Sequence, residues 1–201
     1  MKSYNLSDGD GAALVQTARK IATEFVKNGR ILELDGDIRS RLSFESGIFV
    51  TLNIKDDLRG CIGFPLPRKI AESLPEATIA AATQDPRFSP VKSSELEKIT
   101  FEVTILTPPI EIMTDDPLLL PSKIKVGRDG LMVRQNHHSG LLLPQVPVEY
   151  GWNEEEFLAR TCQKAGLPQE CWKEKQTRIF SFEGIIFKEE QPNGKVIRKK
   201  L

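Results

Sequence analysis

The sequence predicts an α/β fold, because helical and strand patterns alternate along the chain. Residues 10–26 place apolar side chains at intervals of three and four and end at Gly29, which is typical of an amphipathic helix. Residues 99–107 alternate apolar and polar side chains, which is typical of a strand with one buried face. Residues 47–54 are rich in β-branched and aromatic types, and three polar residues separate them from residues 58–64, which predicts a β-hairpin.

Shorter patterns complete the expected order of elements. The Pro-Leu-Pro run at residues 65–67 is expected to end the second strand of the hairpin, and Pro75 suits the first turn of a further helix. Asn153 followed by Glu156 resembles a capping box, which predicts a helix that stops at Gly166. Other patterns predict a proline-bounded loop at residues 85–90, a short helix around 116–120, strands at 130–134, 140–143 and 177–188, and turns at 136–139 and 192–194.

Length and charge limit the classes of function. The 201 residues suffice for one good core or two small lobes, and we treat residues 1–201 as a single domain. The chain carries 28 basic and 28 acidic residues, and this balance removes the long-range attraction on which non-specific binding to nucleic acid or anionic membranes relies. A basic tail with Lys195, Arg198, Lys199 and Lys200 leaves RNA binding as an alternative, although no aromatic residue is interleaved with these charges.

The sequence contains no signal for a membrane or for export. No apolar run approaches the ~20 residues needed to cross a bilayer, and the first residues lack the apolar stretch of a signal peptide. We therefore expect a cytoplasmic protein. Its three cysteines, Cys61, Cys162 and Cys171, form no even framework, so reduced thiols are expected.

The main candidate for a functional centre is the segment Leu-Arg-Gly-Cys-Ile-Gly at residues 58–63. Alternate side chains of a strand share a face, so Arg59 and Cys61 are expected to lie side by side. A neighbouring guanidinium favours the thiolate, which is the form of cysteine that attacks electrophiles. Gly60 and Gly63 weaken a strand and often mark a bulge or the close approach of a ligand or of backbone. The segment therefore predicts a reactive thiol, with Arg59 lowering its pKa or holding an anionic substrate.

Other observations favour a purely structural cysteine. A lone cysteine on a strand is commonly a small buried hydrophobe. A nucleophilic cysteine normally has a histidine base, and the two histidines of the chain, His137 and His138, lie in a predicted turn far from Cys61 in sequence. These histidines also lack the spacing of a metal site, and the sequence contains no motif for another cofactor. We therefore predict neither a bound metal ion nor another cofactor.

Further polar residues are candidates for substrate binding or proton transfer. Asp85 and Arg87 lie in the proline-bounded loop, where the arginine could grip a carboxylate or phosphate; a mutual salt bridge that pins the loop is the alternative. Glu102, on the polar face of its strand, is a candidate proton shuttle if that face lines a cleft and a solvated residue otherwise. The amide of Gln145 could reach a ligand, although its apolar surroundings also fit a buried strand that ends at Pro144.

Four of these segments resemble, in order, motifs of the AMMECR family, which is named after a chromosomal region linked to Alport syndrome, midface hypoplasia and elliptocytosis. They lie at residues 58–63, 85–88, 140–146 and 149–152, so the resemblance covers nearly the whole chain and suggests a stand-alone member of the prokaryotic type. It implies an α/β fold of the α+β type, in which helices flank a mainly antiparallel sheet. It also implies a larger and a smaller lobe, with residues 58–63 close to the cleft between them.

The resemblance does not bring a reaction with it. Members of the family are associated genetically with Memo-type proteins, which are similar to dioxygenases, and with radical S-adenosylmethionine enzymes, which implies a modification pathway. The leading hypothesis is an enzyme, or a component of one, that uses Cys61 and Arg59 on a small anionic or electrophilic substrate, with Glu102 as a proton shuttle. One alternative is a non-catalytic module that binds a ligand or a protein, in which Cys61 only packs. The other is RNA binding.

Overall fold

The computed structural model describes residues 6–55 and 57–199, which form two compact units. The first unit contains residues 6–106 and 185–199, and the second contains Thr107–Gly184. Strand β7 (Arg178–Glu189) contributes to both units, and Lys200 of the basic tail lies outside the described residues. None of the helices in the two described ranges is both long enough and apolar enough to cross a membrane.

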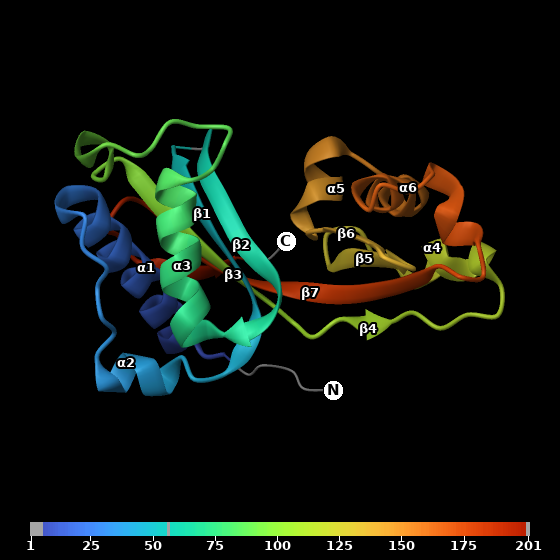
Figure 1. The fold of residues 1–201 in the computed structure, drawn as a ribbon, viewed down its shortest axis with the longest axis horizontal. Coiled ribbons are helices and arrows are strands. Elements are labelled where there is room, and N and C mark those ends of the chain that lie inside the picture. The colour runs from blue at the N-terminus through green and yellow to red at the C-terminus, as the bar shows by residue number, and fades with distance from the viewer. Residues whose placement is uncertain (1–5, 56, 200–201) are drawn as a thin grey trace. The chain divides into compact units, whose positions relative to one another are not determined.

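The first unit packs helices against one face of a sheet (Figure 1). Its elements are α1 (Asp8–Asn28), α2 (Gly36–Arg41), β1 (Glu45–Ile54), β2 (Asp57–Lys69), α3 (Ile70–Thr83), the 3-10 helix η1 (Ser93–Glu95), β3 (Ile99–Leu106), part of β7, and β8 (Val196–Lys199). The strand order is β2, β1, β3, β7, and β8 also pairs with β7. Strand β1 pairs antiparallel with both β2 and β3, which confirms the predicted hairpin. Apolar side chains of α1, α3, β1 and β3 share one buried core.

Helix α1 begins and ends close to where the sequence predicts. The Oγ of Ser7 accepts a bond from the backbone N of Asp10 at 3.2 Å, and Asp10 Oδ2 accepts one from the backbone N of Ser7 at 2.9 Å, which completes a capping box. Gly29 ends the helix with a φ of 67°, in the left-handed region that favours glycine. Between these ends Leu14 and Ile21 are fully buried, so the apolar stripe fixes which face of α1 meets the sheet.

Two predictions about prolines are wrong. Strand β2 continues through Pro65 and Pro67, because its pairing with β1 is irregular at this point and the ladder does not need their missing N–H groups. Pro75 does not start a new helix but lies inside α3, which runs unbroken from Ile70 to Thr83. Leu74 and Ala77, on either side of Pro75, are completely buried, and their packing offsets the lost backbone bond.

The second unit contains a smaller antiparallel sheet covered by helix α6 (Figure 1). Its elements are β4 (Ile110–Glu111), the 3-10 helix η2 (Pro117–Leu119), α4 (Leu120–Lys123), β5 (Asp129–Gln135), β6 (His138–Leu142), α5 (Gln145–Tyr150), α6 (Glu154–Lys164), the 3-10 helix η3 (Gln169–Lys173) and the first part of β7. Strand β5 pairs antiparallel with β6 and β7, which confirms the predicted second sheet region. Asn153 forms the predicted capping box with Glu156 at the start of α6.

The expectation of reduced thiols is wrong for two of the three cysteines. Cys162 in α6 and Cys171 in η3 form a disulfide, with their Cα atoms 6.2 Å apart. The chain turns back at Gly166, whose φ of 74° is left-handed, and this turn brings η3 against the end of α6. Both cysteines are completely buried, so the disulfide belongs to the core of the second unit.

Candidate functional site

Cys61 belongs to a row of side chains that crosses three strands of the first unit. In the register of the sheet, Cys61 on β2 faces Thr51 on β1, and Thr51 faces Glu102 on β3. Residues that face each other across antiparallel strands project from the same face of the sheet. The neighbours Leu52 and Phe101 point into the core that α1 and α3 cover, so the row lies on the opposite face.

The loop that follows α3 holds the backbone of Cys61. The side chain of Asp85 is 2% exposed, and its Oδ2 accepts a bond from the backbone N of Cys61 at 2.8 Å. Arg87 donates to both oxygens of Asp85, at 2.9 and 2.7 Å, and its Nη2 also donates to the carbonyl oxygen of Cys61 at 3.3 Å. The mutual salt bridge that the sequence leaves open is therefore present. Because the side chain of Arg87 is still 53% exposed, it can meet a ligand as well.

A β-bulge changes the surroundings of Arg59. The pairing of β1 with β2 is shifted between Gly60 and Leu58, so that Arg59 is an extra residue opposite no partner. Its guanidinium donates to the carboxylate of Glu95 in η1, from Nε to Oε1 at 2.7 Å and from Nη2 to Oε2 at 3.1 Å. Arg59 and Cys61 were expected side by side because alternate side chains of a regular strand share a face. The bulge interrupts this alternation between the two residues. Glu95, which no sequence pattern singled out, engages the arginine instead.

Burial dominates the protonation of the Cys61 thiol. Cys61 is a free cysteine that is only partly exposed, and burial raises the pKa of its thiol above the usual value. The Thr51 hydroxyl, which donates to Sγ at 3.2 Å, and the positive charge of Arg87 both act to lower this pKa. The negative charges of Glu102 and Asp85 raise it. The thiol of the free protein is therefore protonated at neutral pH, and the cation that acts on it is Arg87.

Gly60 and Gly63 serve close packing within the first unit. A Cβ atom at Gly60 would lie 2.2 Å from the carbonyl oxygen of Ala81 in α3. A Cβ atom at Gly63 would lie 2.2 Å from the carbonyl oxygen of Ile48 and 2.5 Å from the ring of Phe49. These distances are too short for any side chain. The sequence left open whether a ligand or the protein's own backbone approaches these glycines. The structure shows that the backbone does.

Glu102 is almost withdrawn from solvent, at 7% exposure. Its Oε2 lies 4.0 Å from the Nζ of Lys199 on β8, and in the row Thr51 stands between Glu102 and Cys61. A carboxylate and a thiol on either side of a hydroxyl group can exchange a proton through that hydroxyl. The geometry therefore keeps Glu102 as a candidate proton acceptor, and it adds Thr51, which the sequence reasoning missed.

Gln145 and the two histidines belong to the second unit. Gln145 is the first residue of α5, and its Oε1 is buried without a hydrogen-bond partner among the residues that the structure describes. The Nδ1 of His138 lies 3.3 Å from the carbonyl oxygen of Ala165 in the same unit. The apolar residues 141–143 were expected to form a strand that ends at Pro144. Strand β6 ends at Leu142, and a short turn follows it, so this prediction is confirmed only in part.

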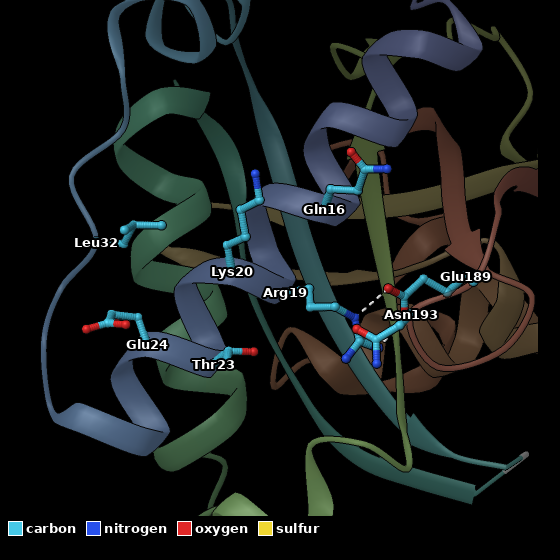
Figure 2. A pocket seen from close by; sticks show the side chains of 9 residues that line it. Gln16, Arg19, Lys20, Thr23, Glu24, Leu32, Glu189 and Asn193 are labelled. Atoms are coloured by element: carbon cyan, nitrogen blue, oxygen red, sulfur yellow. Dashed lines mark hydrogen bonds and ion pairs between the residues drawn. The ribbon is translucent and has the colours of Figure 1, made fainter.

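The first unit also contains two hollows that no pattern in the sequence predicts. One has a volume of about 530 Å³ and lies along α1, as Figure 2 shows. Within it the guanidinium of Arg19 donates from Nε to Glu189 Oε1 at 2.6 Å, and other nitrogens of Arg19 donate to the carbonyl oxygens of Leu96 and Ile99. The other hollow, of about 390 Å³, shares Glu189 with the first. Cys61 lines neither of them.

Comparison with known proteins agrees with this fold. A protein of Thermococcus onnurineus is 51% identical over 98% of this chain and 99% of its own length. A protein of Methanothermobacter thermautotrophicus is 47% identical over 94% of this chain and 100% of its own. The crystal structure of an uncharacterized protein from Pyrococcus horikoshii matches with a TM-score of 0.91 at 48% identity, over 98% of this chain and 100% of the other. The names of these relatives state no activity.

The family comparison matches residues 15–187 to AMMECR1, a range that includes residues 58–63, the Asp85–Arg87 pair and most of β7. Together with relatives that are about as long as this chain and nearly half or more identical to it, this match leads to one conclusion. The chain belongs to the AMMECR1 family.

Proposed function

We propose that the protein is an enzyme, or a component of one, in which the Cys61 thiol reacts with a small anionic or electrophilic substrate. The observation that carries this proposal is the row of Cys61, Thr51 and Glu102 on one face of the sheet. The row provides a nucleophile, a hydroxyl group in hydrogen-bond contact with it, and a carboxylate. A nucleophile and a proton acceptor linked by a hydroxyl group are groups that thiol chemistry can use.

The proposed roles differ from those expected from the sequence. The Thr51 hydroxyl turns to accept the proton of the Cys61 thiol and passes its own proton to Glu102. The thiolate then displaces a leaving group from an electrophilic carbon of the substrate: the carbon–sulfur bond forms as the bond to the leaving group breaks, and the leaving group departs with that electron pair. Arg87 takes over the part that the sequence suggested for Arg59, because its exposed guanidinium beside Cys61 can hold an anionic group. Arg59, bound to Glu95, fixes the position of the bulge. A place in a modification pathway, beside Memo-type and radical S-adenosylmethionine proteins, rests on the family resemblance alone.

A second candidate function is a non-catalytic binding module. It is favoured by the raised pKa of the Cys61 thiol, because a protonated thiol is a poor nucleophile. In this alternative Cys61 only packs, while Arg87 and the loop around it contact the ligand or partner. The two functions differ in what they require of the sulfur atom.

The pH dependence of Cys61 alkylation by iodoacetamide distinguishes them. In the proposed enzyme the rate rises with pH, with a midpoint above the usual range for cysteine, because burial raises the thiol pKa. Thr51→Val removes the hydroxyl that donates to Sγ, so the midpoint moves to still higher pH. Thr51→Ser keeps a hydroxyl group, so its midpoint is expected to stay at the wild-type pH. Intact-protein mass spectrometry measures each rate.

One outcome contradicts the proposal. If Cys61 stays unmodified over the whole pH range in which circular dichroism shows an intact fold, the thiol takes no part in chemistry and the binding module is left. A midpoint that Thr51→Val does not move would remove Thr51 from the proposed route of the proton.

A further inference from the structure

We propose that the smaller hollow of the first unit is a binding site for a small molecule that carries a phosphate group. The hollow, here called the lysine pocket, has a volume of about 390 Å³. Its lining includes Lys55, Lys98, Lys188, Thr100, Glu189 and Glu190. A volume of this size is typical of sites for small ligands. The proposal does not depend on the reactivity of Cys61.

The three lysines come from three distant parts of the chain. Ile54 and Ile99 form the last pair between β1 and β3, so the residues next to them, Lys55 and Lys98, meet where the two strands end. Lys188 reaches the same place from β7. Like charges at neighbouring positions of a sheet destabilise it. An anion that binds between the lysines would remove this repulsion.

The two carboxylates around the lysine pocket offset its three lysines only in part. Glu189 is 2% exposed in its side chain and already binds Arg19, and its Oε2 also accepts a bond from the backbone N of Phe101 at 3.0 Å. Glu190 is exposed to solvent. Among the ion pairs of residues 6–55 and 57–199, none includes one of the three lysines. In a chain of zero net charge, this leaves a local excess of positive charge inside a hollow.

Lys55 also has an unusual backbone. Its φ is 58°, in the left-handed region where asparagine and glycine are the common residues. A lysine at this position costs some stability in comparison with asparagine. A residue with a conformational cost at the mouth of a charged hollow is consistent with a role for its ammonium group, and it offers a substitution that preserves the turn.

Phosphate is the anion that this chemistry suits best. Ammonium groups bind phosphate oxygens as compact point charges, and several of them together match its multiple negative charge. Thr100 adds a hydroxyl group, and it lies on the same strand face as Glu102, two residues along β3. The Thr100 hydroxyl donates to the carbonyl oxygen of Asn53 at 3.5 Å, a long bond that a phosphate oxygen can compete with, so the lining provides both charge and a hydrogen-bond donor.

Calorimetric titration of the full chain with inorganic pyrophosphate, in about 50 mM salt, tests the proposal. Lys55→Asn, Lys98→Gln and Lys188→Gln are each expected to lower the affinity about fivefold, which is the upper range for one exposed charge pair. Lys175→Gln removes the same charge from an exposed position in the second unit and is expected to change nothing. Lys55→Asn is expected to melt no lower than the wild type, so its loss of affinity cannot come from unfolding.

Two results would overturn the proposal: no binding heat at millimolar pyrophosphate, or an equal loss of affinity in Lys175→Gln and the pocket variants. Parallel titrations with AMP and with ribose 5-phosphate identify the source of the phosphate. Binding of one of them more tightly than pyrophosphate assigns the lysine pocket to nucleotides or to sugar phosphates, and binding of neither assigns it to inorganic diphosphate.

Discussion

At Asp85 a single carboxylate binds two parts of the chain at once. Its Oδ2 accepts bonds from the backbone N of Cys61 and from Arg87 Nη2, and its Oδ1 accepts bonds from the Nε and the backbone N of Arg87. The bonds from Arg87, aided by the one from Cys61, hold the pKa of Asp85 far below its usual range. The charge of one residue thus decides where the loop after α3 meets β2.

Asp85→Asn is expected to destabilise the fold by about 1–3 kcal/mol at pH 7, because the amide loses the charge-assisted bonds. A carboxylate with a lowered folded pKa stabilises the fold above its unfolded pKa, about 4, and loses this effect as the pH falls toward the folded pKa. The difference in unfolding free energy between wild type and variant should therefore shrink below about pH 4. Urea unfolding at pH 7 and pH 3 measures it. The exposed Asp115→Asn serves as control, and a difference that is the same at both pH values would contradict the argument.

The residues of the candidate site show where sequence reasoning stops. Strand alternation correctly places Glu102 on the polar face, because β3 pairs regularly with β1 along its whole length. The same argument fails for Arg59, because one extra residue in β2 shifts the faces and alternation cannot reveal a bulge. Glu95 and Thr51 were missed because their contacts depend on pairings between distant segments. A pattern within one strand contains no information about its partner.

At the scale of elements, the contact of β2 with α3 fixes the position of the candidate site. The two elements touch at Gly60, where the absence of a side chain lets the carbonyl oxygen of Ala81 approach the strand. This contact places the end of α3, and the Asp85 loop that follows it, beside Cys61. Gly60 therefore influences the candidate site indirectly, by allowing β2 and α3 to pack closely.

Gly60→Ala is expected to cost about 1–3 kcal/mol, because the new methyl group meets backbone that cannot turn aside. Gly36→Ala at the start of α2 is the matched control, since a Cβ there meets nothing within 4 Å. Thermal unfolding of the two variants and the wild type measures the difference. Equal melting temperatures for Gly60→Ala and the wild type would show that β2 and α3 can move apart freely.

The sequence predicted long elements better than short ones. Helix α1 and the β1–β2 hairpin follow from apolar periodicity because each spans several turns or repeats. Helices α2 and α5 have six residues each, too few for a period to become visible, and they were missed. Strand β8 was missed because its four residues acquire a strand character only by pairing with β7.

At the scale of the whole molecule, the chain forms two units and passes between them twice. It passes from the first to the second at Leu106 and returns at Gly184, in the middle of β7. Each unit has its own apolar core, and the second core contains the Cys162–Cys171 disulfide. Two cores with a shared strand allow one unit to lose stability before the other.

Reduction of the disulfide is expected to weaken the second unit selectively, by about 2–4 kcal/mol, because it releases the constraint between α6 and η3. Amide hydrogen exchange with and without dithiothreitol measures this. Faster exchange is expected in β5, β6 and α6, with β1, β3 and α1 unchanged. Cys61→Ser, which leaves the disulfide in place, is the control. An equal loss of protection in both units would show that they unfold as one.

The bond between Asp85 and the backbone N–H of Cys61 has a consequence for the type of reaction. Enzymes that form tetrahedral intermediates stabilise the oxyanion with preorganised donors, often including the amide of the nucleophile itself. At Cys61 that amide already donates to the buried carboxylate of Asp85, so it is not available to an oxyanion. If the proposed thiol chemistry holds, acyl transfer would need donors from elsewhere, whereas displacement at a saturated carbon forms no tetrahedral intermediate and needs no such donors.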